Sequence, residues 1–321
     1  MRLPRITILG AALTAVLATS AFAQVVQYIV PEAMPSLPYS YGVAFPVEIK
    51  TVDVFVTANG TKFNGTGITS NAPLAKDLKG QMAQSLTNLD SALKELRSSK
   101  MDIAKLDIAF QGNSFDQVEM LSDQLENYFL VRNSSKELKF PPVRTLIGKA
   151  SLGDSQKLVE IKATLIDPKT KPEMMQNQGL EVPEDYGTHG KTVLAGGITA
   201  MNKSYMVKGL NSMRKQLETS LNNLELVLSQ AGATRNDVKY INVYYTPKPD
   251  SDATDPAQAE QLLNDELKKF FGETNAPTVT LAADEVNCSA YLSVLIDAQA
   301  SVKGTKPANA APKPAAKSST L

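Results

Sequence analysis

The sequence has little cysteine and little histidine. Its 321 residues include one of each, Cys288 and His189. A single cysteine excludes an intrachain disulfide, so stability must come from packed cores, and we expect a buried thiol in the alternating run 287–294. His189 has no cysteine or second histidine near it in the sequence, which argues against a metal site and against a Ser-His-Asp triad. We therefore expect no metal and no cofactor.

An excess of charge of one sign is also lacking. The chain has 33 lysines and arginines against 33 aspartates and glutamates, a formal net charge of zero. There is thus no electrostatic case for nucleic acid or an acidic membrane as the main partner. A glycine-rich phosphate loop is missing too, because Gly196-Gly197 is too short and no helix start follows it.

Long apolar runs are confined to the first residues. Arg2 and Arg5 precede an apolar segment at residues 6–18, and Ala-Phe-Ala follows at residues 21–23. This pattern predicts a cleaved secretory signal over residues 1–23 and a periplasmic or secreted mature protein. The alternative is an uncleaved membrane anchor, which is less favoured because the run is shorter than the roughly 20 residues that span a bilayer.

The opposite end has a biased composition. Residues 304–321 consist mostly of proline, alanine, lysine and serine, with no large apolar residue before Leu321. Such a segment cannot bury enough surface to offset its ordering entropy, and we expect a disordered tail.

What the sequence does contain is an internal repeat. Two stretches carry large apolar residues at three- and four-residue spacing, and each has an Asn-Leu pair in its middle. Each is followed by a polar turn, a strand-like run, a second amphipathic segment and a further pair of strand-like runs. The apolar residues are Met82, Leu86, Leu89, Leu93 and Leu96 in the first stretch, and Met213, Leu217, Leu221, Leu224 and Leu228 in the second.

The matched element order predicts two α/β (α+β) domains, each a mixed sheet with two helices on one face. We expect domain 1 at residues 24–166, a linker without periodicity at 167–185, and domain 2 at 186–303. In the second copy, we expect residues 192–194 and 205–208 to form the strands before the first helix.

The first copy resembles the RidA/YjgF family in five segments. Residues 37–43 are similar to the family's N-terminal Pro-Tyr-Ser motif, and residues 54–59 stand where the family has a strand ending in Ser-Gly-Gln. Residues 84–93 match its first helix, residues 141–145 match its Pro-x-Arg-Ser/Thr signature, and residues 158–161 match the Val-Glu-Ile strand. The resemblance implies a chorismate-mutase-like fold and a homotrimer with pockets between neighbouring copies.

The same resemblance implies an enamine/imine deaminase, which hydrolyses 2-imino acids to 2-oxo acids and ammonia. Arg144 would grip the substrate carboxylate, because a planar guanidinium pairs with it bidentately. Glu160 would orient Arg144 or the attacking water, and the family's second-helix asparagine position falls on Ser122. Ala58 replaces a family glycine, which restricts close approach of a ligand to the backbone. The substrate-binding residues would be Tyr39, Thr57, Ala58 and Thr145.

Without the resemblance, interpretations that give these residues no functional role stay open. An arginine after two prolines is typical of a surface, as Arg144 would be. Glu160 alternates with Val159 and Ile161, which is equally compatible with a solvent-facing strand position. Tyr39 is equally compatible with simple packing against a sheet.

The second copy retains the frame of the family but loses its charged groups. Gly196-Gly197 stands at the Ser-Gly-Gln position, and Asn264 falls in the second helix, yet Val279 and Leu295 occupy the arginine and glutamate positions. We therefore expect any chemistry in domain 1, with domain 2 building the assembly.

Two hypotheses follow from this comparison. The chain is either an exported deaminase acting on an imino or oxo acid, or a non-catalytic module that binds a small molecule or builds an assembly. Ribonuclease activity is less favoured because the charge is neutral and a second histidine is lacking.

Overall fold

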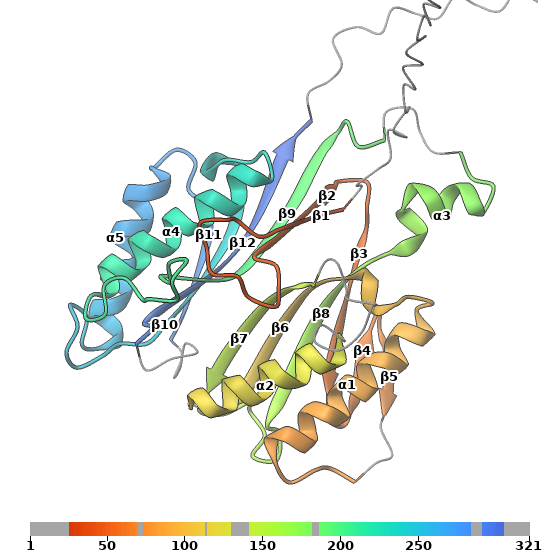
Figure 1. Cartoon of the computed structure of the whole chain (residues 1–321), viewed down its shortest axis with the longest axis horizontal. Coiled ribbons are helices and arrows are strands. Elements are labelled where there is room, and N and C mark those ends of the chain that lie inside the picture. The colour runs from red at the N-terminus through yellow and green to blue at the C-terminus, as the bar shows by residue number, and fades with distance from the viewer. Residues whose placement is uncertain are drawn as a thin grey trace, which may run out of the picture.

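The computed structural model describes residues 26–69, 73–112, 114–129, 141–181, 186–283 and 291–304. These residues form two six-stranded mixed sheets, each packed against two long helices (Figure 1). The α+β class with two domains is therefore confirmed. The predicted signal at residues 1–23, Cys288 and the tail from residue 305 onward lie outside the described residues.

Domain 1 is formed by one continuous stretch. Its sheet has the order β5-β4-β3-β8-β6-β7, in which β6 and β7 run parallel and the other neighbours antiparallel. Parallel neighbours need a crossover, which α2 supplies. The elements are β3 (Thr51–Thr57), β4 (Gly60–Phe63), β5 (Thr66–Thr69), α1 (Leu78–Glu95), β6 (Ile103–Gln111), α2 (Phe115–Tyr128), β7 (Val143–Lys149) and β8 (Val159–Ile166).

Domain 2 repeats this plan. Its sheet has the order β1-β2-β9-β12-β10-β11, again with one parallel pair, β10 and β11. The elements are β1 (Gln27–Ile29), β2 (Gly42–Pro46), β9 (Gly190–Thr199), α4 (Met213–Gln230), β10 (Val238–Tyr245), α5 (Pro256–Phe271), β11 (Thr278–Ala283) and β12 (Val294–Lys303). Strand for strand, β9, β12, β10 and β11 correspond to β3, β8, β6 and β7.

The first helix of each domain confirms the predicted periodicity. The side chain of Asp77 accepts from the Gly80 amide at the start of α1, and that of Ser212 accepts from the Lys215 amide at the start of α4. Such caps satisfy amides that have no partner inside the helix. The apolar stripe of each helix lies in the core of its own domain. Of the ten residues in the two stripes, nine are buried and Leu96 is partly buried.

The N-terminal hairpin departs from the predicted boundaries. We expected residues 24–166 to form domain 1, but β2 pairs antiparallel with β9, and β1 and β2 complete the sheet of domain 2. In domain 1 the corresponding edge of β3 is occupied by β4 and β5. Because that edge is already paired, the open edge of β9 takes the hairpin, and the first strands of the chain belong to the second sheet.

The segment between β9 and α4 also differs from the prediction. Residues 205–208 do not form a strand and make only an isolated bridge between Met201 and Val207. The side chain of Asn202 instead accepts from the amides of Ser204 and Met206, both at 3.0 Å, and closes a compact turn. Asparagine favours such turns because its side chain imitates a backbone acceptor.

The repeated Asn-Leu pair has a structural explanation. The side-chain amide of Asn88 in α1 donates to the carbonyls of Thr57 and Ala58, at 2.8 and 3.1 Å. In α4, Asn223 donates to the carbonyls of Thr199 and Met201, at 2.8 and 3.1 Å. Each asparagine thus holds the end of one strand, β3 or β9, against the first helix of its domain.

The linker is more ordered than its composition predicts. It contains a short 3-10 turn at Pro168–Thr170 and a helix, α3 (Pro172–Asn177). The amine of Lys171 contacts the carboxylate of Asp102 at 2.7 Å, and the hydroxyl of Tyr186 donates to the carbonyl of Thr170 at 2.6 Å. Contacts therefore hold both ends of the linker, and the contact at its N-terminal end is with domain 1.

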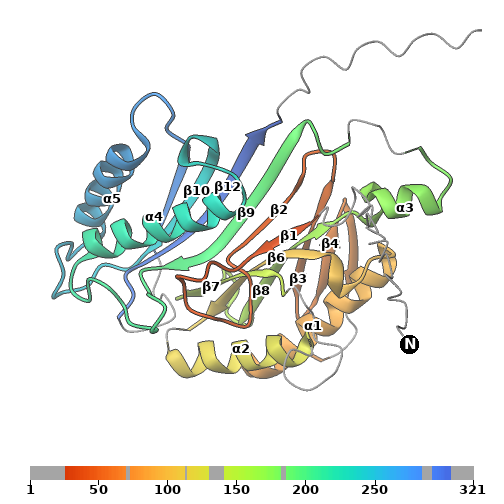
Figure 2. The ribbon, with the colours of Figure 1, turned by 45° about the horizontal axis from the view of Figure 1, so that its top comes forward.

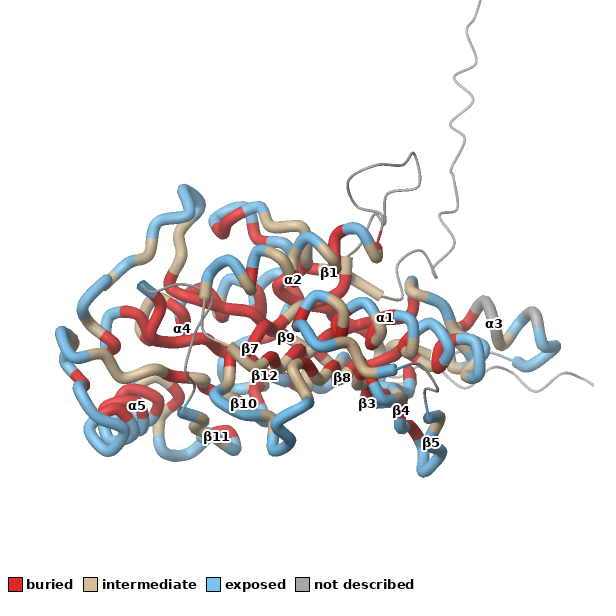
Figure 3. Tube along the Cα trace, turned by 90° about the horizontal axis from the view of Figure 1, so that it is seen from below, coloured by how far each residue is buried: buried red, intermediate tan, exposed pale blue. Residues whose placement is uncertain are grey.

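The two domains lie against each other through β7 and β9, which Figure 2 shows from a second direction. Figure 3 shows buried residues along the strands and the inner faces of the helices, and exposed residues on the outer turns. Among the described residues, no helix is both long and apolar enough to cross a membrane.

Candidate functional site

The predicted anchor, Arg144, lies near the start of β7, where it contacts the N-terminal segment. Its guanidinium stacks over the ring of Tyr39, 4.3 Å from the ring centroid, and Tyr39 packs edge-on against Tyr41. Ser40 fixes this arrangement, because its amide donates to the carbonyl of Pro142 and its hydroxyl to that of Pro141. Two segments of the family resemblance, residues 37–43 and 141–145, thus meet in space.

Arg144 and Tyr39 line a cavity of about 760 Å³ between the two domains. Domain 1 contributes one wall, and the N-terminal segment and domain 2 contribute the others. Among the described residues that line the cavity, Arg144 is the one that is charged. The others are Leu37, Tyr39, Phe115, Val118, Ser122, Leu146, Gly197, Thr199, Met201, Tyr205, Met206, Val207, Leu210, Tyr291, Leu292 and Leu295.

Glu126, a buried carboxylate of α2, was not among the predicted site residues. It lines a smaller hollow together with Arg144, Tyr39 and Phe129. The sequence of α2 gave no sign of this, because Arg144 and Tyr39, which line the same hollow, lie on other elements.

The two glycines of β9 make the close contact between the domains possible. Gly197 has φ +65°, and a Cβ at this position would overlap the carbonyl oxygen of Arg144. A Cβ at Gly196 would lie 2.7 Å from the hydroxyl of Thr145. Glycine is required here because a side chain would separate β9 from β7. The Gly-Gly pair therefore serves the contact between the domains.

Thr145 does not line the cavity. It is fully buried, and its hydroxyl donates to the carboxylate of Asp297 in β12 at 2.7 Å. The same carboxylate accepts from the amine of Lys105 at 2.7 Å and from the amide of Gly197 at 3.1 Å. Thr145, which we expected to bind substrate, is thus part of a buried network that joins the domains.

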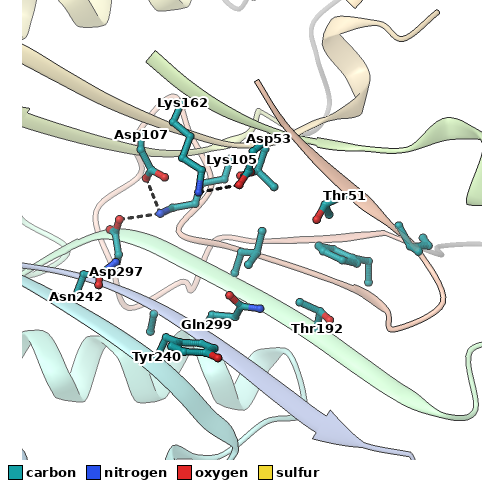
Figure 4. A pocket seen from close by; sticks show the side chains of 15 residues that line it. Thr51, Asp53, Lys105, Asp107, Lys162, Thr192, Tyr240, Asn242, Asp297 and Gln299 are labelled. Carbon is teal, nitrogen blue, oxygen red and sulfur yellow. Dashed lines mark hydrogen bonds and ion pairs between the residues drawn. The ribbon is translucent and has the colours of Figure 1, made fainter. Parts of the chain in front are cut away.

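The charges of this network lie at a second cleft, of about 290 Å³, where the two sheets face each other (Figure 4). Lys105 also pairs with Asp107, and Lys162 pairs with Asp53 at 3.0 Å. Burial alone would lower the pKa of Lys105, but the carboxylates of Asp297 and Asp107 outweigh it and raise that pKa. Because each lysine contacts a carboxylate, the cleft offers no unpaired cation to an anionic ligand.

Glu160 lies in a third hollow, of about 200 Å³, with Phe55 and Thr57. It stands opposite Thr57 in the pairing of β3 with β8, and its carboxylate contacts the amine of Lys157 at 2.7 Å. Ala58 is buried beside it, and its carbonyl is held by Asn88. Within one chain, Glu160, Thr57 and Ala58 are therefore separate from Arg144 and Tyr39.

The strand register shows which residues of domain 2 occupy the positions of Arg144 and Glu160. Leu106 pairs with Arg144 in domain 1, as Ile241 pairs with Val279 in domain 2. Likewise Glu160 pairs with Thr57, as Leu295 pairs with Thr199. Leu295 and Thr199 line the cavity at Arg144, so this cavity contains the leucine of domain 2 where the family pattern has a glutamate.

Within the described ranges, no group of three histidine, cysteine, aspartate or glutamate side chains is arranged to hold a metal ion. His189 instead contacts the carboxylate of Glu48 at 2.6 Å, close to the exit from the linker.

Comparison with solved structures finds several that are similar in fold to part of this chain. A Rid-family protein from Yersinia pestis is 23% identical over 44% of this chain and 98% of its own, with a TM-score of 0.35. A member of the YjgF/YER057c/UK114 family from Mycobacterium tuberculosis is 22% identical over 40% of this chain and 92% of its own, with a TM-score of 0.28. The YjgF gene product from E. coli is 19% identical over 34% and 79%, with a TM-score of 0.28.

Each of these matches covers less than half of this chain, and each is a similarity of fold. At such identities the similarity concerns the fold alone and carries no information on activity. No protein-family model matches the sequence, and no curated protein is significantly similar to it.

Proposed function

We propose that the chain binds a small carboxylate at Arg144, as the RidA resemblance implies for an imino or oxo acid. The observation that carries this proposal is the guanidinium of Arg144, the one charged group among the cavity-lining residues that the structure describes. A guanidinium remains protonated at any working pH and offers paired donors that match a carboxylate. Away from water, such a charge-assisted pair is stronger than at the surface.

The stack on Tyr39 supports the same proposal. A guanidinium held 4.3 Å from a ring centroid has lost much of its rotational freedom before the ligand arrives. Less ordering is then required on binding, which raises the affinity. Ser40 strengthens this effect by fixing the segment that carries Tyr39.

A second candidate function is hydrolysis of a 2-imino acid to a 2-oxo acid and ammonia. It is favoured by the hydroxyls of Ser122 and Thr199, which line the same cavity and could hold a water. It is weakened by Leu295, since none of the described residues that line the cavity has a carboxylate side chain to orient that water. We therefore place binding first and hydrolysis second.

Isothermal titration of the mature chain with 2-oxobutanoate tests the first candidate. We expect Arg144→Ala to weaken binding at least tenfold, because a hydrogen bond between charged groups contributes about 1.5–3 kcal/mol. Arg235→Ala is the matched control, since Arg235 stacks 4.7 Å from the ring of Phe270 and lies outside the cavity. Equal affinities of the wild type and Arg144→Ala would remove the proposal.

The second candidate is tested with 2-imino acids generated in situ by an amino-acid oxidase. Semicarbazide trapping reports how much imino acid escapes hydrolysis. A rate that depends on Arg144 would establish hydrolysis, and a rate equal to the uncatalysed one would leave binding alone.

We also propose that the protein is exported and acts in the periplasm or outside the cell. The support is the basic, then apolar, then Ala-Phe-Ala pattern of residues 1–23. N-terminal sequencing of the protein from a periplasmic fraction should begin at Gln24. A protein that keeps Met1 in the cytoplasm would contradict this proposal.

A further inference from the structure

Exposed apolar side chains gather around the mouth of the Arg144 cavity. Five of its lining residues are large, apolar and at least half exposed, and we call them the apolar rim. They are Phe115 (59% exposed), Tyr205 (54%), Met206 (57%), Leu210 (50%) and Tyr291 (63%). Scattered apolar residues are ordinary on a protein surface, whereas a cluster around a cavity is typical of a binding site.

The inner part of the cavity is also apolar. Beyond the rim it is lined by aliphatic side chains of both domains, among them Val118, Leu146, Leu292 and Leu295. Its volume of about 760 Å³ lies in the range of roughly 300–1,000 Å³ that is usual for drug-sized ligands. A three- or four-carbon imino acid would leave most of these apolar walls in contact with water.

We propose that the ligand of this cavity is a monocarboxylate with an extended apolar body, of about eight carbons or more. This inference rests on the proposed function, because Arg144 anchors the carboxylate. The body of the ligand lies along the aliphatic walls, and its far end reaches the apolar rim. An anionic head and an apolar tail match the single cation and the apolar lining.

The turn that carries Tyr205 and Met206 of the rim is held in place before any ligand binds. The hydroxyl of Tyr205 donates to the carbonyl of Ser36 at 2.6 Å, and Tyr205 itself has φ +61°. Asn202 holds the amide of Met206, and Lys208 donates its amide to the carbonyl of Ala200. An ordered rim loses little conformational entropy on binding, which favours the ligand.

The part of this rim formed by Tyr205, Met206 and Leu210 has no counterpart among the described residues of domain 1. There the first strand is followed by β4 and β5, which extend the sheet, whereas β9 is followed by the turn that carries Tyr205 and Met206. The difference between the two copies thus lies at the cavity as well as at the sheet edge. Most of the selection for apolar length would therefore belong to the second copy, although the first copy contributes the arginine and Phe115.

Titration of the mature chain with graded ligands tests the proposal. Butanoate and octanoate form the aliphatic arm, and 2-oxobutanoate and phenylpyruvate form the oxo-acid arm, so that the source of the apolar body is distinguished. Each methylene that becomes buried should improve affinity about fourfold. We expect octanoate to bind at least about tenfold more tightly than butanoate, and octanamide, which lacks the charge, to bind more weakly than octanoate.

Two matched variants connect the effect to the rim. Met206→Gln should lower the affinity for octanoate about fivefold or more and leave that for butanoate unchanged. Met101→Gln is the control, because Met101 is similarly exposed, at 53%, and lies outside the cavity. Both positions are at the surface, so both variants should fold.

The possible outcomes separate this inference from the function on which it rests. If butanoate and octanoate bind equally and Arg144→Ala abolishes both, the carboxylate site stands and the extended ligand is excluded. If octanamide binds as tightly as octanoate and Arg144→Ala has no effect, the cavity is an apolar site and the inference fails. If no carboxylate binds, the proposed function and this inference both fail.

Discussion

At the scale of single residues, two arginines make the same ring contact for different purposes. Arg235 stacks over Phe270, but its guanidinium also pairs with Glu225 at 2.9 Å and donates to the carbonyl of Phe270 at 2.9 Å. Arg144 stacks over Tyr39 and lines a cavity. Arg235 uses its N–H donors for bonds within the protein, whereas Arg144 can present N–H donors to a ligand.

The most consequential single side chain for stability is Lys105. We expect Lys105→Met to lower the free energy of unfolding by about 3–5 kcal/mol, because Asp297 and Asp107 would remain without their cation. Urea unfolding followed by circular dichroism measures the change. Lys169→Met is the control, since Lys169 lies in the linker, and a loss of less than about 1 kcal/mol in Lys105→Met would contradict the prediction.

A second prediction at the residue scale concerns how the stability of the protein depends on pH. Burial alone would raise the pKa of Glu48, but hydrogen bonds with His189 and the Gly187 amide outweigh it and lower that pKa. A carboxyl group whose pKa is lower in the folded state stabilises the folded protein at pH values above its unfolded pKa of about 4.3. This contribution is lost as the pH falls from there through the folded pKa. We expect stability between pH 5 and pH 3, roughly, to fall more steeply in the wild type than in Glu48→Gln. Parallel pH profiles in urea unfolding would contradict this.

At the scale of elements, the strand-end asparagines should separate structure from binding. Asn88→Ala and Asn223→Ala each remove two hydrogen bonds to carbonyls, and we expect each to destabilise the chain by about 1–3 kcal/mol. Only Asn223 holds Thr199 and Met201, which line the cavity. Asn223→Ala should therefore also weaken octanoate binding, and Asn88→Ala should not. Equal binding in the two variants would contradict this assignment.

The same elements indicate how much the sequence could predict. The periodicity identified α1 and α4 and their buried faces, because a helix of this kind depends mainly on its own spacing. The local sequence does not give the partner of β2, since pairing depends on which edge the rest of the chain leaves open. The assignment of residues 24–166 to one domain was wrong for this reason.

The site was predictable to a similar extent. The resemblance identified Arg144 and Tyr39, which the structure brings together, because the motifs that carry them are local. It could not identify Leu295, Met206 or Asp297 as neighbours of the first copy, since these contacts form only when the two domains meet. For the same reason it grouped Glu160 and Thr145 with Arg144, although neither lines the cavity.

At the scale of the whole molecule, the sheet faces that point away from the helices carry exposed aromatic residues. Phe55 of β3 and Tyr240 of β10 are 53% and 54% exposed, whereas Val54 and Val56 beside Phe55, and Ile241 beside Tyr240, lie in the two cores. Such residues favour contact with another copy. We expect light scattering to give the mass of three mature chains, and Phe55→Asp combined with Tyr240→Asp to lower it. A monomeric wild type at micromolar concentration would contradict this.

The pairing of β2 with β9 also fixes an order of events during synthesis. Residues 27–46 leave the ribosome first, but the strand that covers their edge begins at Gly190. Domain 1 can close in the interval, because all of its strands are already present. The outer edge of this early hairpin must therefore wait for its partner strand until Gly190–Thr199 is made. A chain divided at the linker would yield one nearly complete half carrying a stray hairpin, and a second half that lacks the edge of its sheet.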